Sequence, residues 1–165
     1  MRMPTTALLL LAVGCAARPA PGEKLLGLMN ERLGLMHDVA RWKWNERRPI
    51  DDPERERALL DEVARRGEER GLDPGFVRAF FADQIEAAKE VQHAAFDRWA
   101  GERRGRFDRV RDLADLRKEI DRINGELLAA LAEVAPGDRA GVARRAEGLP
   151  GVAVRTLAGD AGAGR

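Results

Sequence analysis

The stretch "VARWKWNERRPIDDPERERALL", residues 39–60, decides the fold. It begins as an amphipathic helix and breaks in a Pro-containing turn. A second helix then starts, with Asp52 as N-cap and Pro53 at the first helical position. Two helices joined by a short turn are typical of a helical bundle. The same stretch also puts Lys43 and Arg55 on the apolar faces of the two helices, which is unusual for a protein core.

The composition agrees with an all-α protein. The chain has 165 residues, of which 44% are hydrophobic, 35% charged and 5% aromatic. That length and balance suit one globular domain with an aliphatic core. Alanine and leucine are abundant and β-branched residues are scarce, which favours helices over sheets.

Apolar periodicity predicts four long helices. The spans run from about Glu23 to a break at Pro49, from Pro53 to Gly71, from Pro74 to Gly101, and from about Arg109 to Ala135. The segment that follows predicts two short helices around Leu149, Pro150 and Gly151. We therefore expect an all-α bundle of four long helices with short C-terminal helices, in a domain that spans residues 23–158. Residues 159–165 are expected to form a disordered tail.

Residues 1–22 are interpreted as an export signal followed by a linker. Arg2 precedes an apolar run from Ala7 to Val13, and this run is too short to span a bilayer as a helix. The motif "LAVGC" at residues 11–15 resembles a bacterial lipobox, with Ala12 where that pattern prefers leucine. Acylation of Cys15 would make this a periplasmic protein anchored to a bacterial membrane. An ordinary cleaved signal, cut near Ala16 or Ala17, is the alternative.

Cysteine content and charge exclude several classes. Cys15 is the only cysteine, so the exported chain can form no internal disulfide. Loss of residues 1–14 leaves 28 Lys and Arg against 28 Asp and Glu, and a neutral chain lacks the basic field of a nucleic-acid binder. The segment "RRGRFDRVR", residues 103–111, is a local exception. It is interpreted as a solvated interhelical turn, or as a weak contact for anionic surfaces.

Polar side chains recur on the core face of every long helix. On the first helix, Arg32 and Lys43 lie eleven residues apart, which places them on one face about 16 Å apart along the axis. Two long cationic side chains at that spacing can hold a small anion between them. The other helices contribute Asp52, Arg55 and Glu56, then Gln84, Ala88 and Gln92, and finally Arg117 and Asn124.

Each of these residues has a simpler interpretation when it is taken alone. A cation on an apolar stripe often extends to the rim, a glutamine often bonds a nearby backbone group, and Asp52 is already explained as an N-cap. Taken together, four inward cations stand against two inward carboxylates. Because unpaired buried charge costs several kcal/mol per ion, a bound dianion would balance the excess.

Four blocks of the sequence resemble the all-helical chorismate mutases, in particular their exported class. The blocks are "ERLGLMHDVARWKW", "RPIDDPERERALL", "FFADQIEAAKEVQ" with Trp99 after it, and "LRKEIDRIN". The resemblance extends over roughly residues 24–135 and includes the spacings between blocks. It implies a chorismate mutase type II-like fold and conversion of chorismate to prephenate.

The resemblance also implies a role for each polar residue. Arg32 and Arg117 would hold the two carboxylates of chorismate, and Arg55 would support the anionic pocket. Lys43 and Gln92 would donate hydrogen bonds to the ether oxygen, while Asp52 and Glu56 would accept from the ring hydroxyl. Relatives often carry a polar residue in place of Ala88, so that contact with a substrate carboxylate would be missing here.

In the exported class the cation at Arg117 comes from the same chain, so each subunit would hold a complete site even if the protein forms a homodimer. The rearrangement is intramolecular and needs neither a cofactor nor a metal, in agreement with the absence of a ligand-spaced cluster around the two histidines.

Two other functions stay open. The first is an isochorismate-pyruvate lyase on the same fold, since the two activities share pocket chemistry. The second is a non-catalytic helical lipoprotein that acts as a scaffold. Turnover of each substrate separates the two enzymes, and thermal stabilisation by chorismate separates both from a scaffold.

Overall fold

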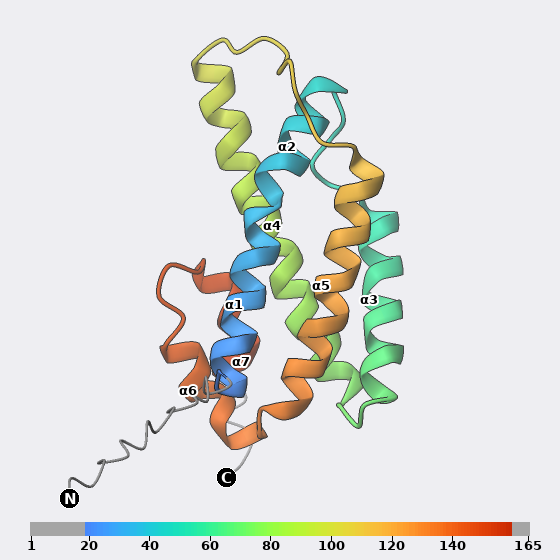
Figure 1. Cartoon of the computed structure of the whole chain (residues 1–165), viewed down its shortest axis with the longest axis vertical. Coiled ribbons are helices and arrows are strands. Elements are labelled where there is room, and N and C mark those ends of the chain that lie inside the picture. The colour runs from blue at the N-terminus through green and yellow to red at the C-terminus, as the bar shows by residue number, and fades with distance from the viewer. Residues whose placement is uncertain (1–18, 160–165) are drawn as a thin grey trace, which may run out of the picture.

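A computed structural model describes residues 19–159, which form an up-and-down helical bundle (Figure 1). No strand occurs in this range. The expectation of an all-α bundle is therefore confirmed. The main helices are α1 Pro21–Gly34, α2 Met36–Asn45, α3 Pro53–Glu68, α4 Pro74–Gly101 and α5 Leu113–Glu133.

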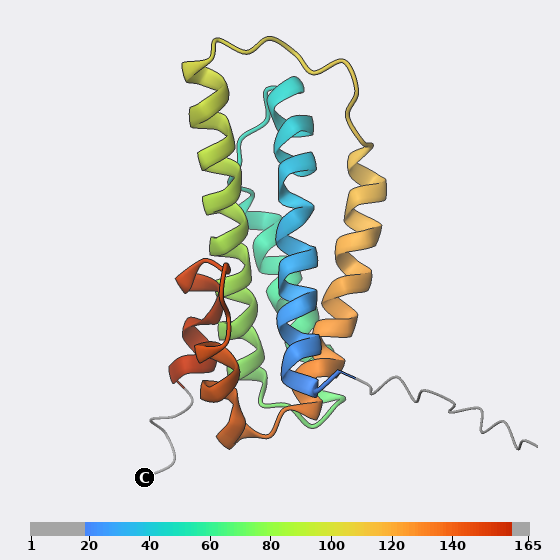
Figure 2. The same cartoon turned by 60° about the vertical axis from the view of Figure 1, so that its left-hand side comes forward.

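The first predicted helix is instead two helices in line. It begins at Pro21 rather than near Glu23, and Leu35 alone separates α1 from α2. The backbone of Leu35 stays helical at φ −68° and ψ −19°. Its carbonyl accepts from the N–H groups of both Asp38 and Val39 at 3.1 Å. The break is thus a local tightening of one turn, and the two helices keep a common direction (Figure 2).

Aspartate caps set the starts of the next three helices. The Asp52 and Asp73 carboxylates accept from the N–H groups of Arg55 at 3.2 Å and Phe76 at 2.6 Å, as the Asp-Pro pairs predict. The predicted start of the fourth long helix near Arg109 is wrong, because Asp112 caps α5. Its carboxylate accepts from the N–H of Ala114 at 2.7 Å, and residues 102–112 form a loop over the end of the bundle.

The core runs along the inside of the four long helices. A separate aromatic cluster lies near the loop of residues 102–112, where Trp99 packs against Trp44, Phe96 and Phe107. The largest side chains that are completely buried in the main core include Leu25, Met29, Phe80, Phe81, Leu116, Ile123, Leu127 and Leu131.

The C-terminal segment folds against α4 (Figure 2). The short helices predicted there lie on either side of Leu149 and Pro150, and Gly151 already begins η2. Ala153 and Leu157 are fully buried, so this segment completes the core. Its elements are η1 Pro136–Asp138, α6 Arg139–Arg144, η2 Gly151–Val154 and α7 Arg155–Gly159.

Asp83 of α4 anchors this segment. Its carboxylate is 2% exposed and accepts from the N–H of Thr156 at 2.7 Å and from the Thr156 hydroxyl at 2.6 Å. Arg155 Nε donates to the same carboxylate at 2.9 Å. Next to it, Gln84 Nε2 donates to the carbonyl of Ala153 at 2.6 Å. Two adjacent α4 residues therefore hold η2 and the start of α7.

Several predictions fall outside the described residues. The predicted export signal, the predicted lipidation site Cys15 and residues 160–165 of the tail all lie there. Gly159, the first residue of the predicted tail, is instead the last residue of α7. Between residues 19 and 159, no helix is both long enough and apolar enough to cross a bilayer.

Asp83→Ala should destabilise the protein by about 2–4 kcal/mol, since it leaves buried donors without an acceptor. Urea denaturation followed by circular dichroism measures this. Asp61→Ala is the matched control, because Asp61 pairs with Arg78 on the surface with 59% of its side chain exposed. The control should change the unfolding free energy by less than about 0.5 kcal/mol. Equal losses for the two variants would contradict the anchoring role of Asp83.

Candidate active site

A cavity of about 130 Å³ lies between α1, α2, α3, α4 and α5 of the single chain. Ligand pockets are typically 300–1,000 Å³, so the cavity must widen to admit a drug-sized molecule. Its apolar wall includes Met36, Val39 and Ile85. All eight residues predicted from sequence line it: Arg32, Lys43, Asp52, Arg55, Glu56, Ala88, Gln92 and Arg117.

Arg32 is the most buried cation of the cavity, at 3% exposure. Its Nε donates to Asn124 Oδ1 at 3.1 Å and its Nη1 to the Gln84 carbonyl at 2.9 Å. Burial lowers the pKa of Arg32 to about 10, and the Asp121 carboxylate opposes part of that shift. Among the described residues, no carboxylate forms an ion pair with Arg32. The guanidinium is therefore charged at neutral pH and held by neutral acceptors.

Lys43 lies closer to the cavity mouth. Its Nζ donates to the carbonyl of Ile50 at 2.6 Å. Burial lowers the pKa of Lys43 below 10.5, and the nearby Arg117 lowers it further, while Asp52 and Glu56 act in the opposite direction. An ammonium group has three donors, so Lys43 can bind a ligand without releasing Ile50.

Gln92 is 4% exposed, and only part of its hydrogen-bonding capacity is used. Its Nε2 donates to the Ala88 carbonyl at 3.0 Å and lies 3.9 Å from Met36 Sδ. Within the described chain, its Oε1 is buried without a partner. A thioether is a weak acceptor, so a ligand oxygen can readily take the second N–H of Gln92. Ala88 contributes only a methyl group to the wall.

The start of α3 supplies the acidic side of the cavity. The N–H of Asp52 donates to Glu56 Oε1 at 3.3 Å, while the Asp52 carboxylate caps the helix. Arg55 lies 3.8 Å from Asp121, with 45% of its side chain exposed. Asp52 therefore acts as the N-cap that the simpler interpretation proposed and also faces the cavity.

Two charged residues of the cavity were missed from sequence. Lys89 Nζ lies 3.3 Å from Glu56 Oε2, 3.5 Å from Asp51 and 2.7 Å from Glu86. It follows Ala88 directly and lies beside the polar stripe rather than on it, so periodicity alone passes it over. Asp121 follows Arg117 by four residues, and that helical spacing was the available signal.

Two of the other predicted core residues take structural roles. Gln84 holds the C-terminal segment, and Asn124 holds Arg32.

The cavity carries more positive than negative charge. Five cations face three carboxylates: Arg32, Lys43, Arg55, Lys89 and Arg117 against Asp52, Glu56 and Asp121. Within residues 19–159, no group of three or more His, Cys, Asp or Glu residues is placed to bind a metal.

The structure is thus an all-helical bundle with a cationic cavity between the helices of one chain. The family model described as chorismate mutase type II matches residues 23–93. The solved structure of chorismate mutase from Burkholderia thailandensis has a TM-score of 0.70 and 36% identity, covering 87% of this chain and 97% of that one. This chain belongs to the type II chorismate mutase family.

One further solved structure and two curated relatives are similar to this chain. The secreted chorismate mutase from Yersinia pestis has a TM-score of 0.69 at 25% identity, covering 83% of this chain and 94% of that one. The secreted chorismate mutase of Mycolicibacterium smegmatis is 29% identical over 71% of this chain and 65% of its own length. The monofunctional chorismate mutase of Enterobacter agglomerans is 30% identical over 66% of this chain and 60% of its own length. The chain thus spans less than two thirds of these two curated relatives.

The two lysines of the cavity should titrate on opposite sides of the ordinary lysine pKa. Burial lowers the pKa of Lys43 and Arg117 lowers it further, while hydrogen bonding to Glu86 raises that of Lys89. Carbon-13 NMR of the lysine ε-carbons should therefore place Lys43 below 10.5 and Lys89 above it. Arg117→Ala should raise the pKa of Lys43 because it removes a like charge. Lys118→Ala is the control and should leave it unchanged; equal shifts in both variants would contradict the proximity of Arg117.

Proposed function

We propose that the protein is a chorismate mutase that rearranges chorismate to prephenate in this cavity. The observation that carries the proposal is the excess of positive charge in a partly desolvated cavity whose most buried cation, Arg32, has only neutral partners. A ring compound with two carboxylates supplies the matching charge. Membership of the type II family supports the same substrate.

The proposed roles follow from the chemistry of the rearrangement. One carbon–oxygen bond breaks as one carbon–carbon bond forms within the same molecule, with no proton transfer. Arg32 and Arg117 hold the two carboxylates in the compact conformer, and Arg55 adds positive charge at the mouth. This orientation removes most of the entropic cost of bringing the two carbons together.

Negative charge develops on the ether oxygen as its bond breaks. Lys43 and the second N–H of Gln92 are proposed to donate to that oxygen, and such donors stabilise the transition state more than the ground state. Asp52 and Glu56 are proposed to accept from the ring hydroxyl. Lys89, whose Nζ lies 3.3 Å from Glu56 Oε2, is proposed to orient that carboxylate.

Substitution at the cationic residues tests the site. Arg32→Met, Lys43→Met and Arg117→Ala should each lower kcat/KM for chorismate by at least about 100-fold, since each removes a charge-assisted contact in a desolvated site. Lys118→Ala is the matched control, because Lys118 follows Arg117 but has 79% of its side chain exposed. Prephenate formation is measured directly, and circular dichroism checks the fold. Wild-type turnover by folded Arg32→Met protein would rule out this site.

The same assay separates the rival functions. Incubation with isochorismate should release no pyruvate if the protein is a mutase. A non-catalytic scaffold would turn over neither substrate and would show no rise in Tm with chorismate.

The pH profile tests Gln92. The wild-type rate should be flat from about pH 5 until Lys43 begins to lose its proton, since the amide does not titrate. Because the pKa of Lys43 is lowered, this decline should begin below the pH expected for an exposed lysine. Gln92→Glu should lose activity near neutrality, where the new carboxylate repels the ether oxygen, and recover as the pH falls. An unchanged profile would show that Gln92 serves only packing.

We also propose that the chain is exported to the periplasm and anchored through Cys15. The secreted relatives from Mycolicibacterium smegmatis and Yersinia pestis support export, and the sequence "LAVGC" supports lipidation. Cys15→Ser should abolish incorporation of labelled palmitate and alter processing of the precursor. Unchanged labelling would leave an ordinary cleaved signal as the explanation.

A further inference from the structure

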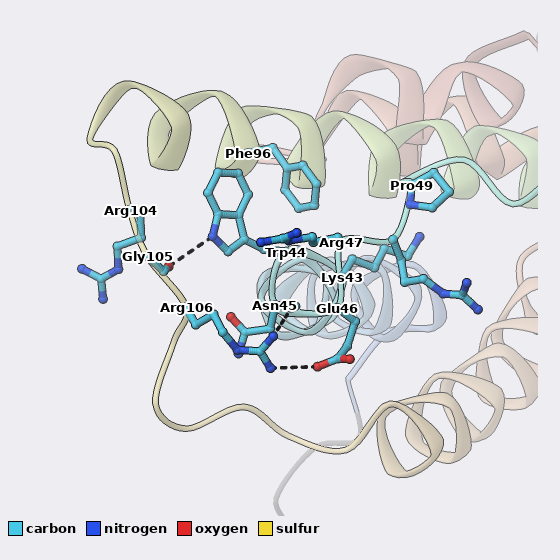
Figure 3. Close-up of a pocket in the computed structure, with 11 residues that line it drawn as sticks. Lys43, Trp44, Asn45, Glu46, Arg47, Pro49, Phe96, Arg104, Gly105 and Arg106 are labelled. Carbon is cyan, nitrogen blue, oxygen red and sulfur yellow. Dashed lines mark hydrogen bonds and ion pairs between the residues drawn. The ribbon is translucent and has the colours of Figure 1, made fainter.

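A second and larger cavity, of about 920 Å³, lies at the end of the bundle beside the loop of residues 102–112 (Figure 3). It shares only Lys43 with the candidate active site. Its wall comes from the end of α2, the turn after it, α4 and the α4–α5 loop. The lining residues are Lys43, Trp44, Asn45, Glu46, Arg47, Arg48, Pro49, Phe96, Arg104, Gly105 and Arg106.

Two half-buried aromatic rings form the apolar part of this wall. Trp44 and Phe96 meet edge to face, with centroids 5.2 Å apart. In Figure 3 they lie between Arg104 and Gly105 on one side and Pro49 on the other. Trp44 Nε1 donates to the Gly105 carbonyl at 3.2 Å, so the indole is fixed against the loop. The rings therefore offer a preformed surface on which a planar group can pack.

The loop beside the rings is itself firmly attached. Asn45 Nδ2 donates to the Phe107 carbonyl at 2.9 Å, and its Oδ1 accepts from the Phe107 N–H at 2.8 Å. Arg106 donates to the Asn45 carbonyl and to Glu46. These contacts give the cavity a defined shape without a ligand, which lowers the entropic cost of binding one.

The charged part of the wall is strongly cationic. It carries Lys43 and four arginines against the single carboxylate of Glu46, which pairs with Arg106 at 3.1 Å. Arg104 stacks over the Phe107 ring at 4.7 Å. The backbone N–H groups of Arg47 and Arg48 donate to the carbonyls of Trp44 at 3.3 Å and Lys43 at 2.9 Å. Their guanidinium groups form no hydrogen bond or ion pair with any described residue. Two guanidinium groups at the mouth are thus available to an anion.

Arg47 lies two residues after the end of α2 and has a left-handed backbone with φ 51°. Among the non-glycine residues of the described chain, only Arg103, two residues after the end of α4, shares a positive φ. This conformation favours glycine, so an arginine there costs about 1 kcal/mol. Because Arg103 lies outside the cavity wall, the pair provides a matched comparison for the role of the Arg47 side chain.

We propose that this cavity is a second binding site, specific for a small molecule that joins a planar ring to a carboxylate. The ring packs on Trp44 and Phe96, and the carboxylate pairs with Arg47 and Arg48, whose planar guanidinium groups match its two oxygens. The proposal does not depend on the proposed catalytic activity, because binding is measured without turnover.

Phenylacetate is the probe, and nitrogen-15 NMR of the three tryptophan indole N–H groups is the readout. Trp44→Phe identifies the Trp44 signal. Phenylacetate should shift this signal saturably, whereas acetate, which lacks the ring, and 2-phenylethanol, which lacks the charge, should bind at least about 10-fold more weakly. The double variant Arg47→Gly with Arg48→Ala should weaken phenylacetate binding about 10-fold. Its fold should be retained, since glycine relieves the strain at residue 47.

Two matched variants make the test selective. Arg103→Gly removes an arginine at the equivalent strained position of α4, outside the cavity wall, and should leave binding unchanged. Arg32→Met disables the candidate active site and should also leave it unchanged.

Three results would overturn the proposal. If Arg32→Met loses phenylacetate binding and the double variant keeps it, phenylacetate binds in the candidate active site instead of this cavity. Equal responses to acetate and phenylacetate would reduce the cavity to general attraction of anions. The third result is no response to phenylacetate at 50 mM, roughly two orders of magnitude above a typical KM, together with a response to polyphosphate. It would show that this end of the bundle binds polyanions instead.

Discussion

The burial of Arg32 without a carboxylate partner is the constraint on which the rest of this structure depends. Burial lowers its pKa to about 10, which corresponds to a cost on the order of 3 kcal/mol for keeping the charge. Asn124 and the Gln84 carbonyl offset part of that cost by accepting two of its hydrogen bonds. An anion in the cavity would offset more, so ligand binding and the stability of the bundle are linked through one side chain.

That link extends to the C-terminal segment. Gln84 accepts from Arg32 through its main chain and donates through its side chain to Ala153. Its neighbour Asp83 holds Arg155 and Thr156. The short helices after α5 therefore support the same turn of α4 that positions Arg32. Loss of these helices would loosen the buried guanidinium although none of their residues reaches the cavity.

Much of the fold and the candidate site could be predicted from the sequence, because both depend on local patterns. Asp-Pro pairs mark the starts of α3 and α4, and the helical period brings all eight predicted residues to one cavity. The catalytic roles of those residues remain predictions. What sequence missed depends on contacts between distant segments: Asp83 with Arg155, Lys89 with Glu56, and the attachment of the α4–α5 loop to Asn45. The cap at Asp112 was a local signal, obscured by the arginine-rich stretch before it.

Because the cavity is lined by one chain, its integrity does not depend on the protein concentration. All five cations and all three carboxylates belong to a single polypeptide. A site built across a subunit interface loses occupancy as the protein is diluted below its dimer dissociation constant. A cavity lined by one chain has no such threshold, so the proposed site would stay assembled in each molecule however far it is from another copy.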